Sequence, residues 1–369
     1  MSESTVYIDS FGEYDTGRLV RDLTDSICEL EVQIPGGTKV LIKPNVLGAY
    51  APERHITTHP AVIEAVVRVL LDNGNKVVIA DSSSIPGGTG RALQKSGIAS
   101  LGETFDDVTV FPLEGLETRD YSNDGNYYLK KVNLPRFLDD VACMVNVPKL
   151  KSHSLTKLTG AVKNLLGCIP GGGKQQAHVI APSTEEFSHL LVDLYGFLKP
   201  KIALNVMDGI VGIDGLGPGP TGRRNQAELF AVSADAVALD MACTRAVRSD
   251  PRSVATSRFA VDRGLANAEF DTTREIEPIR FRLPFTIPFQ PVLAFLFKHV
   301  SGLQRRKPAV IEDKCEQCGI CVKVCPVRCI TMDGYPKWDY DRCIFCYCCH
   351  ESCPYAAIKL KASLSFICG

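Results

Sequence analysis

The chain has 369 residues, of which 45% are hydrophobic and 22% charged, a composition typical of globular proteins and long enough for two or three domains. This composition excludes a disordered chain, a collagen and a pure coiled coil. Lysine and arginine together number 41 and aspartate and glutamate 42, giving a formal net charge of -1. There is no overall basic charge of the kind that favours nucleic acid, so we expect no nucleic-acid partner.

The N-terminal sequence MSESTVYIDSFGEYD lacks a basic segment followed by an apolar one, so we expect no secretory signal and a cytoplasmic location. The most apolar stretch, residues 285–297, contains Pro288 and Pro291. It is also shorter than the roughly 20 apolar residues that a membrane span needs. We expect no span. Because basic residues follow this stretch, peripheral membrane contact stays open as an alternative to a linker packed on the core.

Short β-branched runs alternate with amphipathic helical patterns from about residue 38 to residue 250, which predicts an α/β domain with a mostly parallel sheet and flanking helices. In the first unit, Thr57 or Thr58 is the expected helix cap and Gly74 the terminator. The expected strands are 39–43, 76–80, 141–147, 202–206 and 228–232, and the expected helices are 59–72, 156–166, 185–198 and 235–247.

A change in composition marks the predicted domain boundary. Residues 283–308 are first proline-rich and then basic, and a cysteine-rich region follows. We therefore predict an α/β domain over residues 1–282, a linker over 283–308 and a small α+β domain over 309–369.

Cysteine chemistry is concentrated at the C-terminal end. Four of the fifteen cysteines are scattered through the first 314 residues, and the other eleven fall between Cys315 and Cys368. In a large chain without a recognisable signal peptide, clustered cysteines more often bind metal than form disulfides.

The clustered cysteines form two quartets of the pattern C-x-x-C-x-x-C-x-x-x-C-P. The first is Cys315, Cys318, Cys321 and Cys325, and the second is Cys343, Cys346, Cys349 and Cys353. In this pattern three thiolates surround one iron–sulfur cubane while the fourth reaches the partner cluster. Two tetrahedral zinc sites are the alternative, but they would leave the triplets and the following prolines unexplained.

The double motif resembles that of bacterial two-cluster ferredoxins. The resemblance implies two [4Fe-4S] clusters, one held by Cys315, Cys318, Cys321 and Cys353, the other by Cys343, Cys346, Cys349 and Cys325. When the two repeats are superposed, Cys329 falls on Ala357, a small packing position. Cys348 falls on Ile320 and is expected to be a spare thiol beside the cluster.

A basic, glycine-rich segment lies at the centre of the chain. Between Val141 and Thr184 there is no aspartate or glutamate. The basic residues of the segment are Lys149, Lys151, His153, Lys157, Lys163, Lys174 and His178. Because they follow a strand end and accompany a Gly-Gly-Gly run, we predict an anion site, with a solvated basic face as the alternative.

Three further segments are expected at the same edge of the sheet. They are residues 43–45, residues 81–90 and the glycine-rich segment 208–222, which either approaches a ligand or forms an ordered Ω-like loop. Walker and dinucleotide-binding spacings are missing, so nicotinamide binding is not supported. His55 and His59 straddle a helix start, and we expect capping or core roles for them.

These motifs together resemble the domain-of-unknown-function 362 family in its form fused to a two-cluster ferredoxin. The motifs that carry the resemblance are Lys-Pro-Asn at 43–45, Asn146, Pro-Lys-Leu-Lys-Ser-His at 148–153, Gly-Ala-Val-Lys-Asn-Leu at 160–165 and the segment 208–222. The resemblance implies an α/β domain with an iron–sulfur partner in anaerobic or low-potential metabolism. Its matching residues become site candidates: Lys43, Asn45, Lys149, Lys151, His153, Lys163, Asn164 and Asp208.

The leading hypothesis is an oxidoreductase that passes electrons through two clusters to an anionic small molecule or an organic cofactor. Lys149, Lys151 and Lys163 would hold its anionic groups, Lys174 would assist, and His153 would move a proton. Lys151 and His153 are the expected catalytic residues, and a redox protein is the expected partner. The alternatives are a non-enzymatic electron carrier or cluster-delivery protein, and a nucleotide-using transferase or ligase whose clusters are structural or regulatory.

Overall fold

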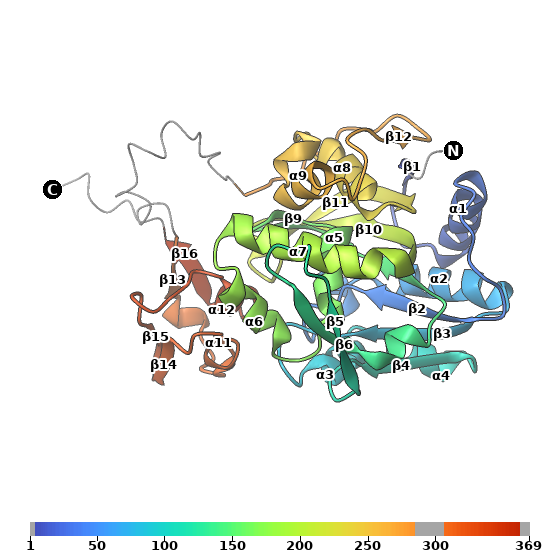
Figure 1. The fold of residues 1–369 in the computed structure, drawn as a ribbon. Helices are drawn as coiled ribbons and strands as arrows, with labels where there is room; N and C mark the ends of the chain where they lie inside the picture. Colours follow the sequence, from blue (N-terminus) through green and yellow to red (C-terminus); the bar gives the residue numbers. More distant parts are fainter. Residues whose placement is uncertain (1–3, 285–305, 362–369) are drawn as a thin grey trace.

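The computed structural model describes residues 4–284, referred to below as the α/β domain, and residues 306–361, referred to as the C-terminal module (Figure 1). Residues 285–305 and Cys368 lie outside these ranges. They include most of the predicted linker and the apolar stretch considered for membrane contact. Across the two described ranges, no helix combines the length and the apolar character needed to cross a bilayer.

A ten-stranded sheet forms the centre of the α/β domain. Most neighbouring strands are parallel, as predicted; the antiparallel pairs are β1 with β11, β10 with β11, and β8 with β9. In sheet order the strands are β12 (Asp271–Thr272), β1 (Thr5–Ser10), β11 (Gly222–Ser233), β10 (Ile202–Gly215), β7 (Cys143–Val147), β2 (Lys39–Pro44), β3 (Lys76–Asp81) and β4 (Val108–Pro112). Strand β8 (Lys149–His153) pairs with β10 and β9 (Lys157–Thr159).

Helices cover both faces of the sheet, so the domain has two hydrophobic cores. Along β2, Leu41 belongs to one core while Val40 and Ile42 belong to the other, as expected for a strand buried on both faces. The helices are α1 (Thr16–Glu29), α2 (Pro60–Asp72), α3 (Thr89–Lys95), α4 (Leu101–Thr104), α5 (Ala161–Asn164), α6 (Gly173–Ile180), α7 (Thr184–Leu198), α8 (Ala236–Ala246) and α9 (Ala255–Asp262). A separate hairpin joins β5 (Thr118–Ser122) to β6 (Lys131–Pro135).

The structure corrects several of the predicted element boundaries in the central segment. Residues 149–153, which follow the predicted strand 141–147 and were assigned to no strand or helix, form β8, because their backbone pairs with β9 and β10. The predicted helix 156–166 is instead strand β9, the single turn of α5 and a short 3-10 turn over residues 165–168. Much of the expected glycine-rich loop 208–222 belongs to β10 and β11, which leaves residues 216–221 as their connection.

The start of α2 also differs from the prediction. His59, not Thr57 or Thr58, is the N-cap, since its Nδ1 accepts a hydrogen bond from the Ala61 amide at 3.3 Å. Thr58 donates to the carbonyl of Val147 at 2.8 Å and so ties the loop to the sheet. The capping role expected for His59 is confirmed. Gly74 follows the helix with a φ of 76°, where a side chain would be strained.

The C-terminal module repeats one pattern twice. Strand β13 (Lys307–Val310) pairs with β16 (Ile358–Lys361), and β14 (Ile330–Asp333) pairs with β15 (Tyr335–Trp338). Two single-turn helices, α11 (Ile320–Lys323) and α12 (Cys348–Glu351), lie between them. Each helix starts after a residue in the left-handed region, Gly319 and Tyr347. This internal repeat matches the 28-residue offset of the two quartets, 343 minus 315.

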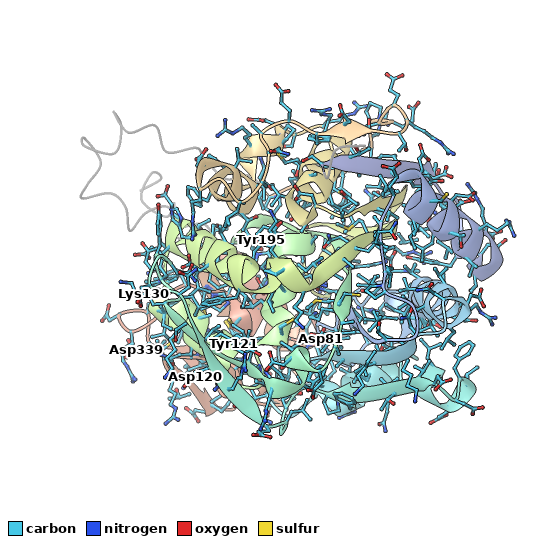
Figure 2. The ribbon with its side chains drawn as sticks, turned by 45° about the vertical axis from the view of Figure 1, so that its right-hand side comes forward. Asp81, Asp120, Tyr121, Lys130, Tyr195 and Asp339 are labelled. Carbon is cyan, nitrogen blue, oxygen red and sulfur yellow. The ribbon has the colours of Figure 1, made fainter. Side chains whose placement is uncertain are left out.

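The two parts of the protein meet where α12 lies beside α6 (Figure 1). Figure 2 shows Asp81 and Tyr195 inside the α/β domain, and both are buried, whereas Asp120 and Lys130 on the β5–β6 hairpin are exposed. Charges on this hairpin are therefore solvated, while Asp81 faces groups in the interior.

Candidate functional site

The eight predicted ligand cysteines line two separate cavities of the C-terminal module. The first, with about 330 Å³ of empty space, is lined by Cys315, Cys318, Cys321 and Cys353. The second, with about 300 Å³, is lined by Cys325, Cys343, Cys346 and Cys349, together with the two spare residues Cys329 and Cys348. Each cavity draws its fourth cysteine from the other quartet, so the donor sets fit two [4Fe-4S] clusters held by crossed quartets.

Local backbone groups stabilise these sulfurs. The amide of Cys329 donates to Cys325 Sγ at 3.4 Å, and the amide of Ala357 donates to Cys353 Sγ at 3.3 Å. Within residues 4–284 and 306–361, no three His, Cys, Asp or Glu side chains are gathered closely enough to hold a single metal ion. The cysteines surround a space instead of converging on one point.

A third hollow, referred to below as the pocket, lies between the α/β domain and α12. It encloses about 670 Å³ of empty space, part of it open to solvent. Three stretches of the α/β domain and one of the C-terminal module supply its polar lining: Lys43, Asn45, Asp81, Ser82, Ser84, Thr159, Lys163, Asn164, Lys174, Gln175, His178, Cys348, Glu351 and Ser352. Five of the predicted site residues meet here, namely Lys43, Asn45, Lys163, Asn164 and Lys174.

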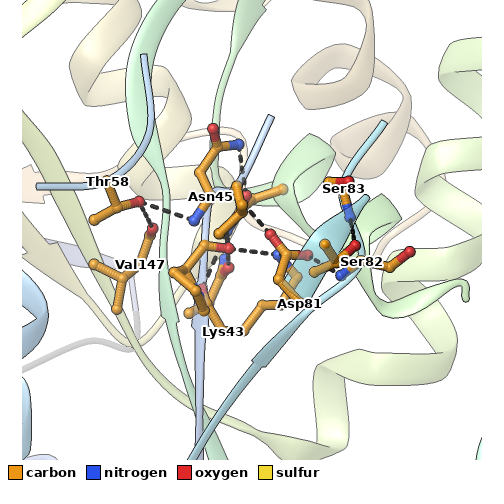
Figure 3. A network of polar contacts seen from close by, with 12 residues as sticks. Lys43, Asn45, Thr58, Asp81, Ser82, Ser83 and Val147 are labelled. Carbon is orange, nitrogen blue, oxygen red and sulfur yellow. Dashed lines mark hydrogen bonds and ion pairs between the residues drawn. The ribbon is translucent and has the colours of Figure 1, made fainter. Parts of the chain in front are cut away.

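Lys43 and Asp81 form an ion pair at the end of neighbouring parallel strands (Figure 3). Lys43 Nζ lies 2.9 Å from Asp81 Oδ1, and both side chains are almost fully buried. Asp81 Oδ2 accepts a hydrogen bond from the Val46 amide at 2.7 Å. Gly167 packs so closely on this pair that a Cβ there would clash with both side chains. The two side chains are therefore held in place, and the positive charge of Lys43 is already balanced by the carboxylate of Asp81.

A chain of amides connects Lys151 to the pocket. Lys151 Nζ donates to Asn45 Oδ1 at 2.5 Å and to the carbonyl of Ile56 at 2.9 Å. Asn45 in turn donates to Asn164 Oδ1 at 2.8 Å. Lys151 is 1% exposed, and burial, followed by the charges of Lys163 and Lys149, lowers its pKa well below the usual value. It lies one side chain behind the pocket and positions Asn45.

Lys163 and Lys174 supply positive charge to the pocket itself. Burial lowers the pKa of Lys163, while the nearby Glu351 and Cys348 oppose this shift. Lys174 Nζ donates to the carbonyl of Ser83 at 3.2 Å, and burial lowers its pKa to about 8. With Lys43 matched by Asp81, these two lysines are the cations best placed to meet a bound anion.

Several buried polar atoms of the pocket have no hydrogen-bond partner within the described ranges. They are Thr159 Oγ1, Gln175 Oε1, Ser352 Oγ and Glu351 Oε1, the last of which lies near His153 Nε2 without forming a hydrogen bond. Thr159 and Ser352 are 4% and 3% exposed. Because unpaired buried polar groups cost free energy, their presence along one pocket indicates that the pocket receives a polar ligand or water.

His153 joins the α/β domain to α12. Its Nδ1 accepts hydrogen bonds from the amides of Leu155 and Thr156 at 3.1 and 3.2 Å, so in the neutral ring the proton is on Nε2. Nε2 lies 3.2 Å from Glu351 Oε1. Burial alone would raise the pKa of Glu351, but His153 and Lys163 outweigh it and lower the pKa to about 2. Glu351 is thus a carboxylate between His153 and the pocket.

Lys149 and Asp208 lie away from the pocket and pair with each other. Lys149 Nζ is 2.8 Å from Asp208 Oδ2, and both side chains are fully buried. Tyr14 accepts a hydrogen bond from Lys149 at 2.8 Å and donates to Asp208 at 3.0 Å, and Asp208 also accepts from the amide of His59. These contacts tie β8 and β10 to the loop before α2.

The connection between β10 and β11, residues 216–221, contacts α12. A Cβ on Gly219 would lie 2.5 Å from the carbonyl oxygen of Glu351. Thr221 Oγ1 lies 3.1 Å from His350 Nε2. The segment 208–222 was expected either to approach a ligand or to form an ordered loop, and its Gly219 admits the backbone of the C-terminal module.

Sequence reasoning missed Thr159, Gln175, Glu351 and Ser352 as lining residues. Glu351 and Ser352 lie between two ligand cysteines, where the spacing indicates nothing about a neighbouring domain. The cysteine quartet around these residues was the available signal that α12 lies close to a proposed cluster. Gln175 follows Lys174 on α6 and could have been grouped with the basic segment.

Comparisons with known proteins agree with this organisation. Residues 40–245 match the family described as "Domain of unknown function (DUF362)". Residues 308–331 and 336–359 match the family described as "4Fe-4S binding domain". These matches, together with the pyruvate synthase subunit described next, support iron–sulfur electron transfer by the C-terminal module, which in turn indicates redox partners.

A thylakoid-associated protein of Synechocystis is 29% identical over 303 residues, which cover 78% of this chain and 91% of that protein. The PorD subunit of pyruvate synthase from Methanothermobacter marburgensis is 44% identical over 65 residues, 17% of this chain and 78% of that subunit. Among solved structures, the lactate racemase apoprotein of Thermoanaerobacterium thermosaccharolyticum has a TM-score of 0.38 and 10% identity, covering 64% of this chain and 56% of that chain. That likeness is too distant to carry a functional argument.

Proposed function

The chain belongs to the DUF362 family and carries two 4Fe-4S binding motifs, and we propose on this basis that it is an iron–sulfur oxidoreductase acting on a small anion. Residues 1–282 would form the substrate domain and residues 309–369 the two-cluster domain, joined by residues 283–308. The substrate, or a bound organic cofactor, would occupy the pocket. One-electron transfer is the chemistry that the two clusters supply when bound.

The observation that carries this proposal is the shared wall of the pocket. Cys348, Glu351 and Ser352 line the pocket. In the sequence they are interspersed with three proposed cluster ligands, Cys346, Cys349 and Cys353. A protein that only carries electrons to a partner has no need of a polar pocket at this place. The pocket therefore favours an enzyme over a carrier or a cluster-delivery protein.

We assign the pocket residues distinct roles. Lys163 and Lys174 would hold the carboxylate or phosphate group of the ligand, and Asn45, Asn164 and Thr159 would bind its other polar atoms. Lys43 would hold the Asp81 carboxylate in place at the pocket edge. Lys149 and Asp208 would act at a distance, by holding the loop that carries Asn45.

Proton movement is assigned to His153 and Glu351. The Nε2 proton of His153 lies beside the Glu351 carboxylate, and Glu351 lines the pocket. A two-electron reduction of the substrate would consume two electrons, delivered one at a time by a redox protein, and two protons from solvent at the open side of the pocket, which Glu351 would relay while His153 holds it in place. Lys151 would hold Asn45 in place. Both His153 and Lys151 act through a neighbour, so we treat them as positioning residues.

The cellular setting is part of the same proposal. We place the protein in the cytoplasm and in low-potential, anaerobic metabolism, with a redox protein as its electron donor. The Synechocystis relative is named as thylakoid-associated, so fractionation of native cells under anaerobic conditions tests this location. Recovery in the membrane fraction would contradict it.

The decisive experiment identifies the ligand. The full chain is purified without oxygen and denatured, and the supernatant is analysed by mass spectrometry. We expect a stoichiometric anionic molecule, lost in Lys163→Gln and retained in Lys157→Gln. Lys157 is a matched control, since it bonds Ser249 and Ser253 outside the pocket. Iron and sulfide without such a molecule, together with electron exchange with a protein partner alone, would favour the carrier.

A further inference from the structure

Cys348 occupies a place that no other residue in the described ranges shares. It lines the pocket together with Lys163 and Glu351, and it lines the second cysteine cavity together with Cys346 and Cys349. Cys348 thus lies between the proposed anion site and the proposed ligands of the second cluster.

The contacts of Cys348 differ on the two sides. Toward the cavity, it lines the same space as Cys346, so its S–H is placed to donate to the sulfur of that proposed ligand. Toward the pocket, it shares the lining with the cation Lys163. An anion on Lys163 would therefore be separated from the Cys346 sulfur by a single side chain, and it would be a second acceptor for the one S–H that Cys348 can donate.

The second spare cysteine provides a contrast. Cys329 Sγ lies 3.6 Å from Cys325 Sγ and lines the same cavity, but it is not among the residues that line the pocket. The first cavity is lined by its four proposed ligands without a spare thiol. The structure thus connects the pocket to the second cavity through Cys348.

We propose that anion binding in the pocket and the reduction potential of the second cluster are thermodynamically linked through Cys348. The inference rests on the proposed function, because it requires an anion in the pocket. A donor to a ligand sulfur stabilises the added negative charge of the reduced state and raises the potential. A bound anion draws this donor away and adds negative charge beside Cys346, so both effects lower the potential.

Reciprocity follows from this linkage. If the anion makes reduction less favourable, reduction weakens anion binding by the same factor. The oxidised protein therefore binds the anion more tightly. Because the bound anion lowers the reduction potential, the second cluster gives up its electron more readily once the anion is bound. The cluster is therefore the stronger reductant when its proposed electron acceptor, the anion, is present.

The test uses the cluster-loaded full chain and inorganic phosphate as the probe. Redox titrations followed by electron paramagnetic resonance give the potential with and without phosphate, and calorimetry gives phosphate affinity for the oxidised and dithionite-reduced protein. Cys315→Ser, which removes a proposed ligand of the first cluster, identifies the signal of the second. We expect phosphate to lower this potential and to bind the reduced protein more weakly; a tenfold difference corresponds to about 59 mV.

Three variants separate Cys348 from its surroundings. Cys348→Ala should have a lower potential without phosphate and a smaller phosphate-dependent shift, because the donor is gone. Cys348→Ser keeps a donor and should retain the shift. Cys329→Ala should also retain it. Equal phosphate affinity in both oxidation states with an unchanged potential would overturn the linkage and leave the anion pocket standing. Absence of phosphate binding in either state would overturn both the linkage and the proposed anion site.

Discussion

His153 and Glu351 meet at 3.2 Å across the boundary between the α/β domain and the C-terminal module. The histidine comes from β8, an element of the central sheet, and the glutamate comes from α12, which lies between proposed ligand cysteines. The two side chains are 1% and 11% exposed. A buried polar contact of this kind fixes how the two parts are oriented, since either group alone would be left without its partner.

Removing this contact should loosen the C-terminal module. In His153→Ala, Glu351 keeps Lys163 as a neighbour but loses the imidazole, and we expect a loss of about 1 to 3 kcal/mol in the free energy of unfolding. Denaturant melts of the cluster-loaded protein measure it. His189→Ala is the control, because His189 stacks on Phe259 within the α/β domain. Equal stability of His153→Ala and the wild type would contradict an orienting role.

Crossed ligation predicts which cluster each cysteine holds. Although Cys353 belongs to the second quartet, Cys353→Ser should abolish the signal of the first cluster and lower the iron content by about half, because it lines the cavity of Cys315, Cys318 and Cys321. Iron analysis and electron paramagnetic resonance give the answer. Cys329→Ser should keep both signals. Loss of the second cluster's signal in place of the first would show that each quartet holds its own cluster.

The charge of Lys163 should matter for anion affinity. Lys163→Gln removes a charge-assisted hydrogen bond, and we expect phosphate to bind about tenfold or more weakly. Calorimetry on the oxidised protein measures the affinity. Lys157→Gln, on the neighbouring strand, should bind phosphate as the wild type does. Similar losses in both variants would point to a diffuse basic surface.

Anion binding should weaken as the pH rises through the pKa of Lys174. Burial lowers that pKa to about 8, so the ammonium is charged below this pH and becomes neutral above it. With acetate, which keeps its charge between pH 7 and 9, affinity should be higher at pH 7 than at pH 9. Lys174→Arg keeps its charge over this range and should flatten the profile. A flat profile in the wild type would remove Lys174 from the site.

Adding a single methyl group at Gly219 should lower the stability of the protein. In Gly219→Ala the new methyl group meets the Glu351 carbonyl at 2.5 Å, so the connection or α12 must move. We expect a loss of about 1 to 3 kcal/mol and faster release of iron to a chelator. Gly12→Ala is the matched control, because nothing lies within 4 Å of its added carbon. Unchanged iron release in Gly219→Ala would mean that this contact does not support the module.

The fold class and the ligand pattern could be predicted because they depend on local regularities. The β-branched runs 39–43 and 76–80 and the cysteine spacing each appear within a few neighbouring residues. Residues 149–153 were not assigned to a strand because lysine, serine and histidine have little strand tendency; their pairing with β10 and the burial of Lys149 and Lys151 are tertiary effects.

The site could be predicted in part. Lys43, Asn45, Lys163 and Asn164 meet at the pocket because they follow strand ends or start a helix at one edge of the sheet. Lys149 resembles Lys151 in sequence, two positions away, yet it pairs with Asp208 on β10. Lys151 instead contacts Asn45 of the pocket. Which of the two lysines reaches a pocket residue depends on the partner strand, and sequence spacing contains no information about that partner.

Because α12 forms one wall of the pocket, the order of chain synthesis decides when the pocket is completed. Residues 43 to 178 of the lining leave the ribosome long before residues 348 to 352, so the sheet can fold while one side of the pocket is still open. The last wall takes its shape in a segment whose cysteines must also acquire iron and sulfide. We therefore expect the side of the pocket formed by α12 to become fixed only after iron and sulfide have been inserted.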